Sequence, residues 1–108
     1  MKVQNIRHFE EWFQVMQTTG LSQVAMMQLD SGKSTGAEAE AHEKSDQILL
    51  LLEGELKGEI DGAAVKLKRG DFLVIPAGVK HRFSNEGTDE AVTFNVYAPP
   101  AYPADAKG

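Results

Sequence analysis

Residues 70–85, which read GDFLVIPAGVKHRFSN, contain two short strand-like segments separated by a turn. The apolar run Phe72–Ile75 and the segment His81–Asn85 suit strands, and the three residues 76–78 (Pro-Ala-Gly) supply a turn between them. Proline fixes the backbone angle φ, and glycine tolerates the angles that a tight turn demands. Because side chains alternate along a strand, the histidine that opens the second segment shares a face with Phe83. This stretch therefore indicates β structure with a histidine on one strand face.

Similar short segments lie on both sides of this stretch, each bounded by Gly, Pro or Asp. Asp61-Gly62 is the strongest hairpin signal, because glycine accepts the positive φ of a tight primed turn. Seven or so short strands at close intervals predict an antiparallel sandwich or barrel. Besides the two segments above, the expected strands cover residues 22–30, 47–53, 55–60, 63–68 and 91–97.

The N-terminal segment has a different pattern. In residues 6–16 (IRHFEEWFQVM), apolar side chains recur at spacings of three and four, which predicts a short helix that ends before Gly20. We therefore divide the single domain into a helical segment over 1–20, a barrel over 21–98 and an extended Pro/Ala-rich tail over 99–108, pinned at most by Tyr102.

Composition narrows the range of partners. The chain has 108 residues, a formal net charge of -5 and no cysteine, which suits one domain without disulfides, thiolate metal sites or a cysteine nucleophile. The acidic balance disfavours nucleic acid and anionic membranes, because both require a cationic face. With no leader peptide or apolar run long enough to span a membrane in the sequence, we expect a cytoplasmic protein.

One strand is apolar on both faces. Ile48–Leu52 reads ILLLL, so neither face of this strand suits contact with water. The second face could be covered by the other sheet, by the terminal helix or by another copy of the chain. We favour the last and expect a homodimer, which would be contradicted if the protein sediments as a monomer at micromolar concentration.

The histidines give the first indication of chemistry. His42 lies just ahead of the doubly apolar strand, and His81 opens the strand after the Pro-Ala-Gly turn. Neighbouring strands that bring two imidazoles together supply half of a site for a first-row metal, because neutral imidazole suits Fe, Ni, Cu and Zn. A buried, hydrogen-bonded core histidine is the alternative for each.

The stretch 70–85 resembles the second motif of the cupin superfamily, G-x5-P-x-G-x2-H-x3-N. An upstream stretch, residues 36–54, resembles the first motif, G-x5-H-x-H-x3,4-E-x6-G, but Lys44 replaces its second histidine and Gln47 its glutamate. The resemblance implies a small single-domain protein of the cupin 2 conserved-barrel type, an all-β antiparallel jelly roll. The matching positions are Gly36, His42 and Gly54 in the first motif, and Gly70, Pro76, Gly78, His81 and Asn85 in the second.

The same resemblance implies a divalent metal bound by His42, His81 and Gln47. His42 and Gln47 are an odd number of residues apart, so both can face one cavity only if a bulge or kink lies between them. On an unbroken strand Asp46 shares the phase of His42 and becomes the rival ligand. Lys44 either holds a carboxylate or another anion of a ligand, or is simply an exposed lysine at a strand end.

Three classes of function remain open. The first is a metal-dependent enzyme of dioxygenase, isomerase or lyase type acting on a small polar or aromatic molecule, with Leu49, Phe83 and Phe94 (and Met26 or Met27) as pocket walls. The second is a non-catalytic module that binds or senses a small molecule or metal. The third is a structural barrel with an incidental pocket, because one fold hosts many chemistries.

Overall fold

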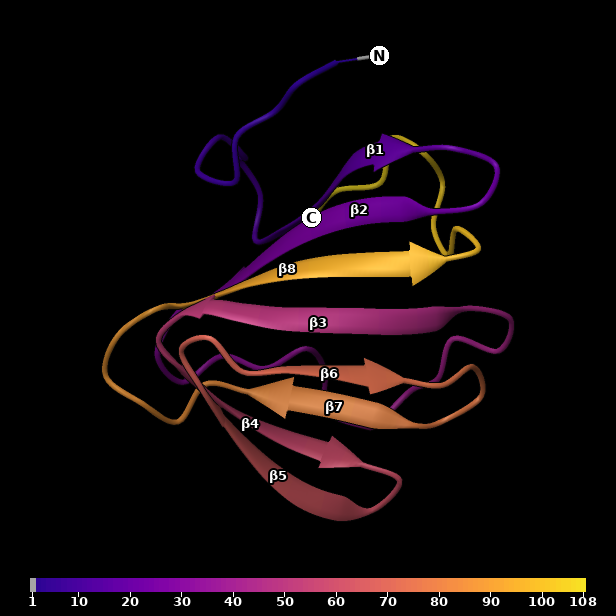
Figure 1. Ribbon diagram of the computed structural model, residues 1–108. Coiled ribbons are helices and arrows are strands. Elements are labelled where there is room, and N and C mark those ends of the chain that lie inside the picture. The colour runs from indigo at the N-terminus through magenta and orange to yellow at the C-terminus, as the bar shows by residue number, and fades with distance from the viewer. Residues whose placement is uncertain (1) are drawn as a thin grey trace.

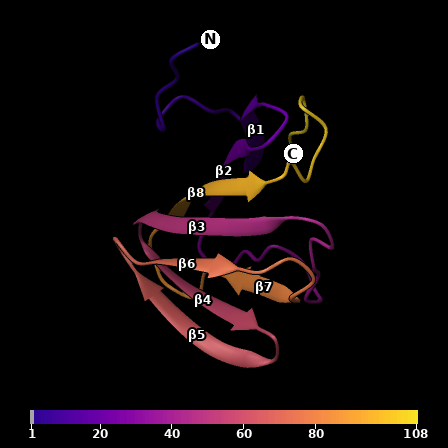
Figure 2. The same cartoon turned by 45° about the vertical axis from the view of Figure 1, so that its right-hand side comes forward.

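The computed structural model describes residues 2–108 as two antiparallel β-sheets (Figure 1). The larger sheet has the strand order β1-β2-β8-β3-β6, and the smaller sheet has the order β5-β4-β7. Figures 1 and 2 show β1 and β5 at opposite extremes of the molecule, with β8 and β3 between them. The strands are β1 (Phe13–Thr18), β2 (Gln23–Leu29), β3 (Asp46–Glu53), β4 (Glu55–Ile60), β5 (Ala63–Lys68), β6 (Phe72–Ile75), β7 (His81–Ser84) and β8 (Ala91–Ala98).

The core lies between the two sheets and follows the alternation of the strands. In β3, Leu49 and Leu51 are fully buried, and they pack in one cluster with Ile75 of β6 and Phe83 of β7. Each such side chain contributes roughly 1.5–3 kcal/mol when it is buried. The all-β jelly roll expected from the sequence is therefore confirmed, and the strands fall close to the predicted ranges.

Two turns show why glycine occupies its positions. At the β4–β5 hairpin, Asp61 and Gly62 have φ of 50° and 80°, as a primed turn requires. Between β3 and β4, Gly54 has φ of 81°, and a Cβ there would lie 2.4 Å from the carbonyl oxygen of Glu90. A side chain at position 54 is excluded on both grounds, which fixes the sharp passage from one sheet to the other.

The predicted N-terminal helix is wrong. Residues 2–12 contain a turn at Ile6-Arg7 but no helix, and β1 begins at Phe13 and pairs with β2. The apolar residues of this segment contact two different surfaces, which together produce a helix-like spacing. Phe13 packs inside the barrel, whereas Ile6 and Met16 line a groove on the outer face. Residues 2–108 contain no helix that could cross a membrane.

The C-terminal tail is held more firmly than predicted. It returns alongside β1 (Figure 1), where the amide of Val15 donates to the carbonyl of Ala106 at 2.9 Å and the amide of Gly108 donates to that of Phe13 at 2.8 Å. The buried side chain of Gln23 in β2 accepts hydrogen bonds from the amides of Ala101 and Tyr102, and donates one to the Tyr102 carbonyl at 2.8 Å. The tail thereby becomes part of the wall at one end of the barrel.

Candidate functional site

A cavity of about 390 Å³ opens at the end of the barrel where β3 and β7 begin and β8 ends. It combines imidazole, amide, phenol and carboxylate groups with aromatic rings. The lining residues that bear on its chemistry are Trp12, Phe13, Glu38, Glu40, His42, Gln47, His81, Phe83, Tyr97 and Tyr102.

The two predicted histidines meet in this cavity. Their ring centres are 5.2 Å apart. His81 is the first residue of β7, and its Nδ1 lies 3.1 Å from the carbonyl oxygen of Val79. Because a carbonyl can only accept, that nitrogen carries the proton in the hydrogen-bonded neutral ring, and the lone pair is left on Nε2.

His42 lies in the connection before β3 and is enclosed by aromatic rings. Its ring meets Tyr97 and Tyr102 nearly edge-on, at centre distances of 4.9 and 5.4 Å. Burial lowers the pKa of His42 below its ordinary value of 6.5, and the neighbouring His81 lowers it further, whereas Glu40 opposes the shift. The neutral imidazole, which is the form that binds metals, is therefore favoured.

Gln47 lines the same cavity and holds a buried acceptor without a partner among residues 2–108. Its side chain is 4% exposed, its Nε2 donates to Asn95 Oδ1 at 3.1 Å, and its Oε1 has no hydrogen-bond partner among residues 2–108. Asn95 Nδ2 in turn donates to Thr93 Oγ1 at 2.9 Å and to the carbonyl of Ala25 at 3.4 Å. Since Asn95 must keep Nδ2 on these acceptors, its oxygen faces Gln47 and requires the Gln47 amino group. The free oxygen of Gln47 is thus fixed by its neighbours.

The break required between His42 and Gln47 is a turn. Glu43 and Lys44 form that turn, and β3 starts only at Asp46. The carboxylate of Asp46 is exposed and accepts the amide hydrogen of Ala77 at 2.9 Å. Of the two alternatives at this position, it is Gln47 that lines the cavity with the histidines.

The predicted ligand-contacting residues are only partly brought together. Phe83 lines the cavity, and Leu49 lies fully buried in the core cluster against it. Phe94 instead lines a groove on the outer face of the larger sheet, because the inward residues of β8 have the opposite parity. Lys44 is exposed in the turn before β3 and is not a lining residue of the cavity, so the structure gives no support to its role in holding an anion there.

Two tyrosines, Tyr97 and Tyr102, line the cavity although the sequence did not predict them as site residues. The rings of Tyr97, at the end of β8, and Tyr102, in the tail, lie nearly edge-on with their centres 5.2 Å apart. Burial raises the pKa of Tyr97 well above its ordinary value of 10.0, and burial raises that of Tyr102 as well. The alternation of β8 contains a signal for Tyr97, since Thr93, Asn95 and Tyr97 share one buried phase, whereas the predicted pocket residue Phe94 belongs to the other.

The cavity holds no complete metal site of the usual acidic or imidazole kind. Within the part of the chain that the structure describes, no three His, Cys, Asp or Glu side chains lie close enough together to hold a metal ion. The potential donors that share this lining are two imidazoles and the amide of Gln47, with Glu40 acting on His42.

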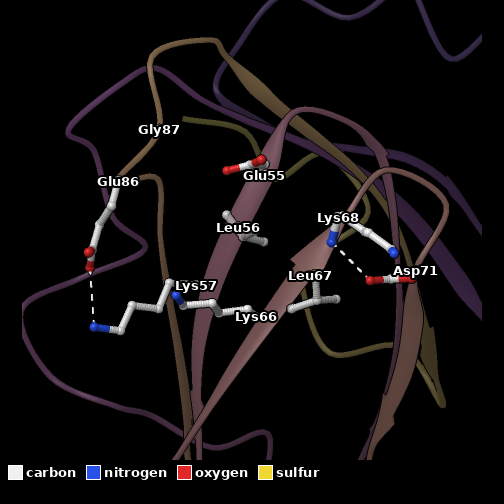
Figure 3. Close-up of a pocket in the computed structure, with 9 residues that line it drawn as sticks. All are labelled: Glu55, Leu56, Lys57, Lys66, Leu67, Lys68, Asp71, Glu86 and Gly87. Carbon is white, nitrogen blue, oxygen red and sulfur yellow. Dashed lines mark hydrogen bonds and ion pairs between the residues drawn. The ribbon is translucent and has the colours of Figure 1, made fainter.

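A second, more open hollow of about 670 Å³ lies where β4 begins and β5 ends, at the other end of these strands (Figure 3). Its lining carries charges of both signs, and one ion pair lies among them. Lys57 Nζ lies 3.5 Å from Glu86 Oε2, and Asp71 Oδ2 accepts the backbone amide of Lys68 at 2.9 Å. It contains no histidine or unsatisfied buried polar atom among the described residues, so the histidine-lined cavity is the better candidate.

An antiparallel jelly roll with histidines gathered inside one end defines a broad class of small β-barrel proteins. A family model described as Cupin domain matches residues 25–97, and the chain belongs to the cupin family. The structure of BH2720 from Bacillus halodurans superposes with a TM-score of 0.86 at 23% identity, covering 94% of this chain and 80% of that chain. At that identity the likeness concerns the fold.

Two curated relatives come from Streptomyces. The polyketide synthase CurC of Streptomyces cyaneus is 36% identical over 50 residues, which cover 46% of this chain and 32% of that protein. The tetracenomycin polyketide synthase protein TcmJ of Streptomyces glaucescens is 38% identical over 56 residues, which cover 51% of this chain and 38% of that protein. The matched stretch thus spans about a third of the length of these relatives.

Proposed function

We propose that this protein binds a first-row divalent metal ion (Fe, Ni, Cu or Zn) through His42, His81 and Gln47. We further propose that it acts with that ion on a small polar or aromatic molecule, as an enzyme of dioxygenase, isomerase or lyase type. The observation that carries the proposal is the buried, unpartnered Oε1 of Gln47 in the same cavity as two neighbouring imidazoles. A buried acceptor left without a partner costs about 1–3 kcal/mol, which a ligand would recover.

The donor set fits such an ion. A first-row metal lies about 2.0–2.1 Å from an imidazole nitrogen, so two rings on one ion have centres roughly 5 Å apart. The observed separation is 5.2 Å. The lowered pKa of His42 favours its neutral, coordinating form, and the hydrogen bond between His81 Nδ1 and the carbonyl of Val79 orients the second ring so that Nε2 is available to a metal. Without a carboxylate, the set suits imidazole-binding metals better than Mg²⁺ or Ca²⁺.

When bound, the metal would supply Lewis acidity or oxygen activation at the base of the cavity. The surrounding residues have separate tasks. Asn95 orients the amide of Gln47, and Phe83 and Tyr97 exclude water because both are buried. The raised pKa of Tyr97 keeps its hydroxyl protonated at neutral pH, so that it remains a hydrogen-bond donor beside His42.

The experiment is elemental analysis of the tag-free protein, as purified and after adding back iron, nickel, copper and zinc. We expect about one ion per chain in the wild type and a loss of that ion in His42→Ala and His81→Ala. His8→Ala is the matched control, because His8 is exposed in the N-terminal segment and outside the cavity. A wild type that stays empty under every condition would sink the metalloenzyme proposal.

The names of the two curated relatives connect both with polyketide synthesis, which supports a small organic molecule as the ligand. The ring-lined cavity is compatible with such a molecule. We therefore propose that oxygen-uptake and isomerisation assays of the metal-loaded protein begin with phenolic compounds. Turnover that His81→Ala abolishes would support the enzyme.

A non-catalytic binding module is the second candidate, favoured by the neutral amide of Gln47 where the family motif has a carboxylate. Two imidazoles and one amide hold a metal less tightly than a set that includes an anionic ligand. Saturable binding of metal and ligand, with no product formed from any assayed compound, would support the module and contradict the enzyme.

We also propose that a second copy of the chain covers the outer face of β3 and β6. Ile48, Val74 and Phe72 are 41, 56 and 68% exposed on adjacent strands. An exposed apolar strip on an edge strand is a common site of association. We expect a dimer in sedimentation at micromolar concentration and a monomer for Val74→Lys. A monomeric wild type would contradict this proposal.

A further inference from the structure

The charged groups that line the cavity are all acidic. Glu38 and Glu40 line it, and neither lysine nor arginine does so among residues 2–108. The basic side chains nearest along the chain do not line it: Lys44, Lys80 and Lys107 are exposed, and Arg82 Nε donates to the carbonyl of Gly36. A ligand therefore meets negative charge at the entrance without a compensating cation.

Glu40 is held at this entrance by its backbone. Its amide donates to the carbonyl of His81 at 3.0 Å, and the amide of His81 donates back to its carbonyl at 2.9 Å. Glu40 acts electrostatically on both His42 and Tyr102, whose rings are neighbours with centres 5.4 Å apart. The backbone of Glu40 is consequently fixed, and its exposed side chain adds negative potential beside these two rings.

Aromatic rings form one continuous wall beside these carboxylates. The ring of Phe13 lies 6.0 Å from that of Trp12 and 4.8 Å from that of Tyr102, which in turn lies 5.2 Å from Tyr97. Aromatic walls favour flat apolar rings and, through their negative faces, cations. Deeper in the cavity, Gln47 Oε1 is a buried acceptor without a partner, which independently calls for a donor or a positive group.

From these three features we infer that the cavity selects hydroxylated aromatic amines and discriminates against aromatic carboxylates. The ring lies against the aromatic wall, a hydroxyl or the metal satisfies Gln47, and the ammonium group lies toward Glu38 and Glu40. This inference rests on the proposed function in that it concerns the ligand of the same cavity. It replaces the expectation that Lys44 receives an anionic ligand.

Three ligands with one phenol ring and different tails test the inference: tyramine (cationic), 4-ethylphenol (neutral) and 4-hydroxyphenylacetate (anionic). Each is titrated calorimetrically into the full chain after chelator treatment, so that a carboxylate cannot gain affinity by coordinating a metal. We expect tyramine to bind tightest and the acid weakest, with tyramine about fivefold tighter than 4-ethylphenol, the effect of one ion pair in high dielectric.

The acidic residues are tested by substitution. Glu40→Gln and Glu38→Gln together should bring the affinities of tyramine and 4-ethylphenol within about twofold of each other, because the ion-pair contribution is removed. Glu55→Gln is the matched control: it changes the net charge equally per site but lies in the hollow at the other end of the barrel. It should leave the order and spacing of affinities unchanged.

Equal affinities, a tighter fit for 4-hydroxyphenylacetate, or no binding of any of the three would overturn the inference. The proposed metal function fails separately, on the metal content measured by elemental analysis. If the protein never takes up metal but prefers tyramine, this inference stands and the proposed metal function is wrong. If the protein binds metal stoichiometrically but prefers 4-hydroxyphenylacetate after chelation, only the inference about the ligand is wrong.

Discussion

At the scale of single residues, the chemistry of the cavity depends on which way one amide points. Asn95 donates its Nδ2 hydrogen to Thr93 Oγ1, so its Oδ1 faces Gln47 and accepts from Gln47 Nε2. The other side-chain atom of Gln47, Oε1, is therefore left without a partner among residues 2–108. All three side chains are at least nine-tenths buried, so water cannot easily replace any of these bonds. A neutral oxygen fixed in this way is a weak ligand that is nevertheless ready to bind.

Replacing the amide by a carboxylate should therefore strengthen metal binding. Gln47→Glu adds an anionic oxygen to the two imidazoles, and we expect the affinity for Ni²⁺ or Zn²⁺ to rise by about tenfold or more. Competition with a chromophoric chelator measures this change, and Gln47→Leu, which removes the oxygen, should weaken binding. If all three proteins bind metal equally, Gln47 is not a ligand.

The two tyrosines give a prediction about pH. They are the only tyrosines in the chain, and burial raises the pKa of both above the ordinary value of 10.0. Above this pH the unfolded chain loses its phenolic protons while the folded chain keeps them, so the free energy of unfolding falls as pH rises. The contribution is fully present below 10.0 and is lost as pH approaches the folded-state pKa values.

Absorbance titration of the tyrosinate band measures the effect directly. In the folded protein neither tyrosine should ionise near 10.0, whereas both should do so in urea. Tyr97→Phe should reduce the alkaline loss of stability, because one of the two buried phenols that ionise only in the unfolded chain is removed. Normal ionisation of both tyrosines in the folded protein would contradict the enclosed arrangement of His42.

At the scale of elements, the C-terminal tail reaches the cavity because β2 holds it. Gln23 is 1% exposed and makes three hydrogen bonds to the backbone of Ala101 and Tyr102, 78 and 79 residues away in sequence. These hydrogen bonds hold the backbone of the tail in a position that places the ring of Tyr102 beside His42.

Gln23→Met keeps the length of this side chain and removes its polar atoms. We expect a loss of about 1–3 kcal/mol in the free energy of unfolding, because the two tail amides lose their acceptor. Hydrogen exchange at Val15 and Gly108, whose amides pair β1 with the tail, should also become faster. Gln17→Met is the control, because the Gln17 side chain donates to the carbonyl of Lys2 and, among residues 2–108, makes no hydrogen bond to the tail. Unchanged exchange in Gln23→Met would show that β1 alone retains the tail.

The elements also show which features a sequence can predict. Strands bounded by turn residues were predicted closely, because alternation and glycine act locally, as at Asp61-Gly62. The N-terminal helix was wrong because helical spacing also results when a strand and an irregular segment contact different surfaces. His42, His81 and Gln47 could be found from motif spacing. Tyr102 and Glu40 could not, because the tail packing and the pairing of Glu40 with His81 are long-range contacts.

At the scale of the whole molecule, metal binding and folding should be coupled, because the three proposed ligands come from separate parts of the chain. His42 precedes β3, Gln47 lies within it and His81 opens β7 in the other sheet. The unfolded chain does not hold these groups together, so an ion that binds the folded state shifts the equilibrium towards it. At a free metal concentration of about 100 Kd the stabilisation is about 2.7 kcal/mol.

For a domain of this size, 1 kcal/mol raises Tm by roughly 4–8 °C, so near-saturating Ni²⁺ or Zn²⁺ should raise Tm by about 10 °C or more. Differential scanning calorimetry measures this rise in Tm. The rise should vanish in His81→Ala and persist in His8→Ala, since His8 is exposed and lies outside the cavity. The stability of metal-free His81→Ala shows whether His81 is a structural histidine or a metal ligand. A structural histidine would cost stability without any change in metal response, whereas a ligand would lose the response and keep most of the fold. An equal shift in all three proteins would mean that the metal binds outside the cavity.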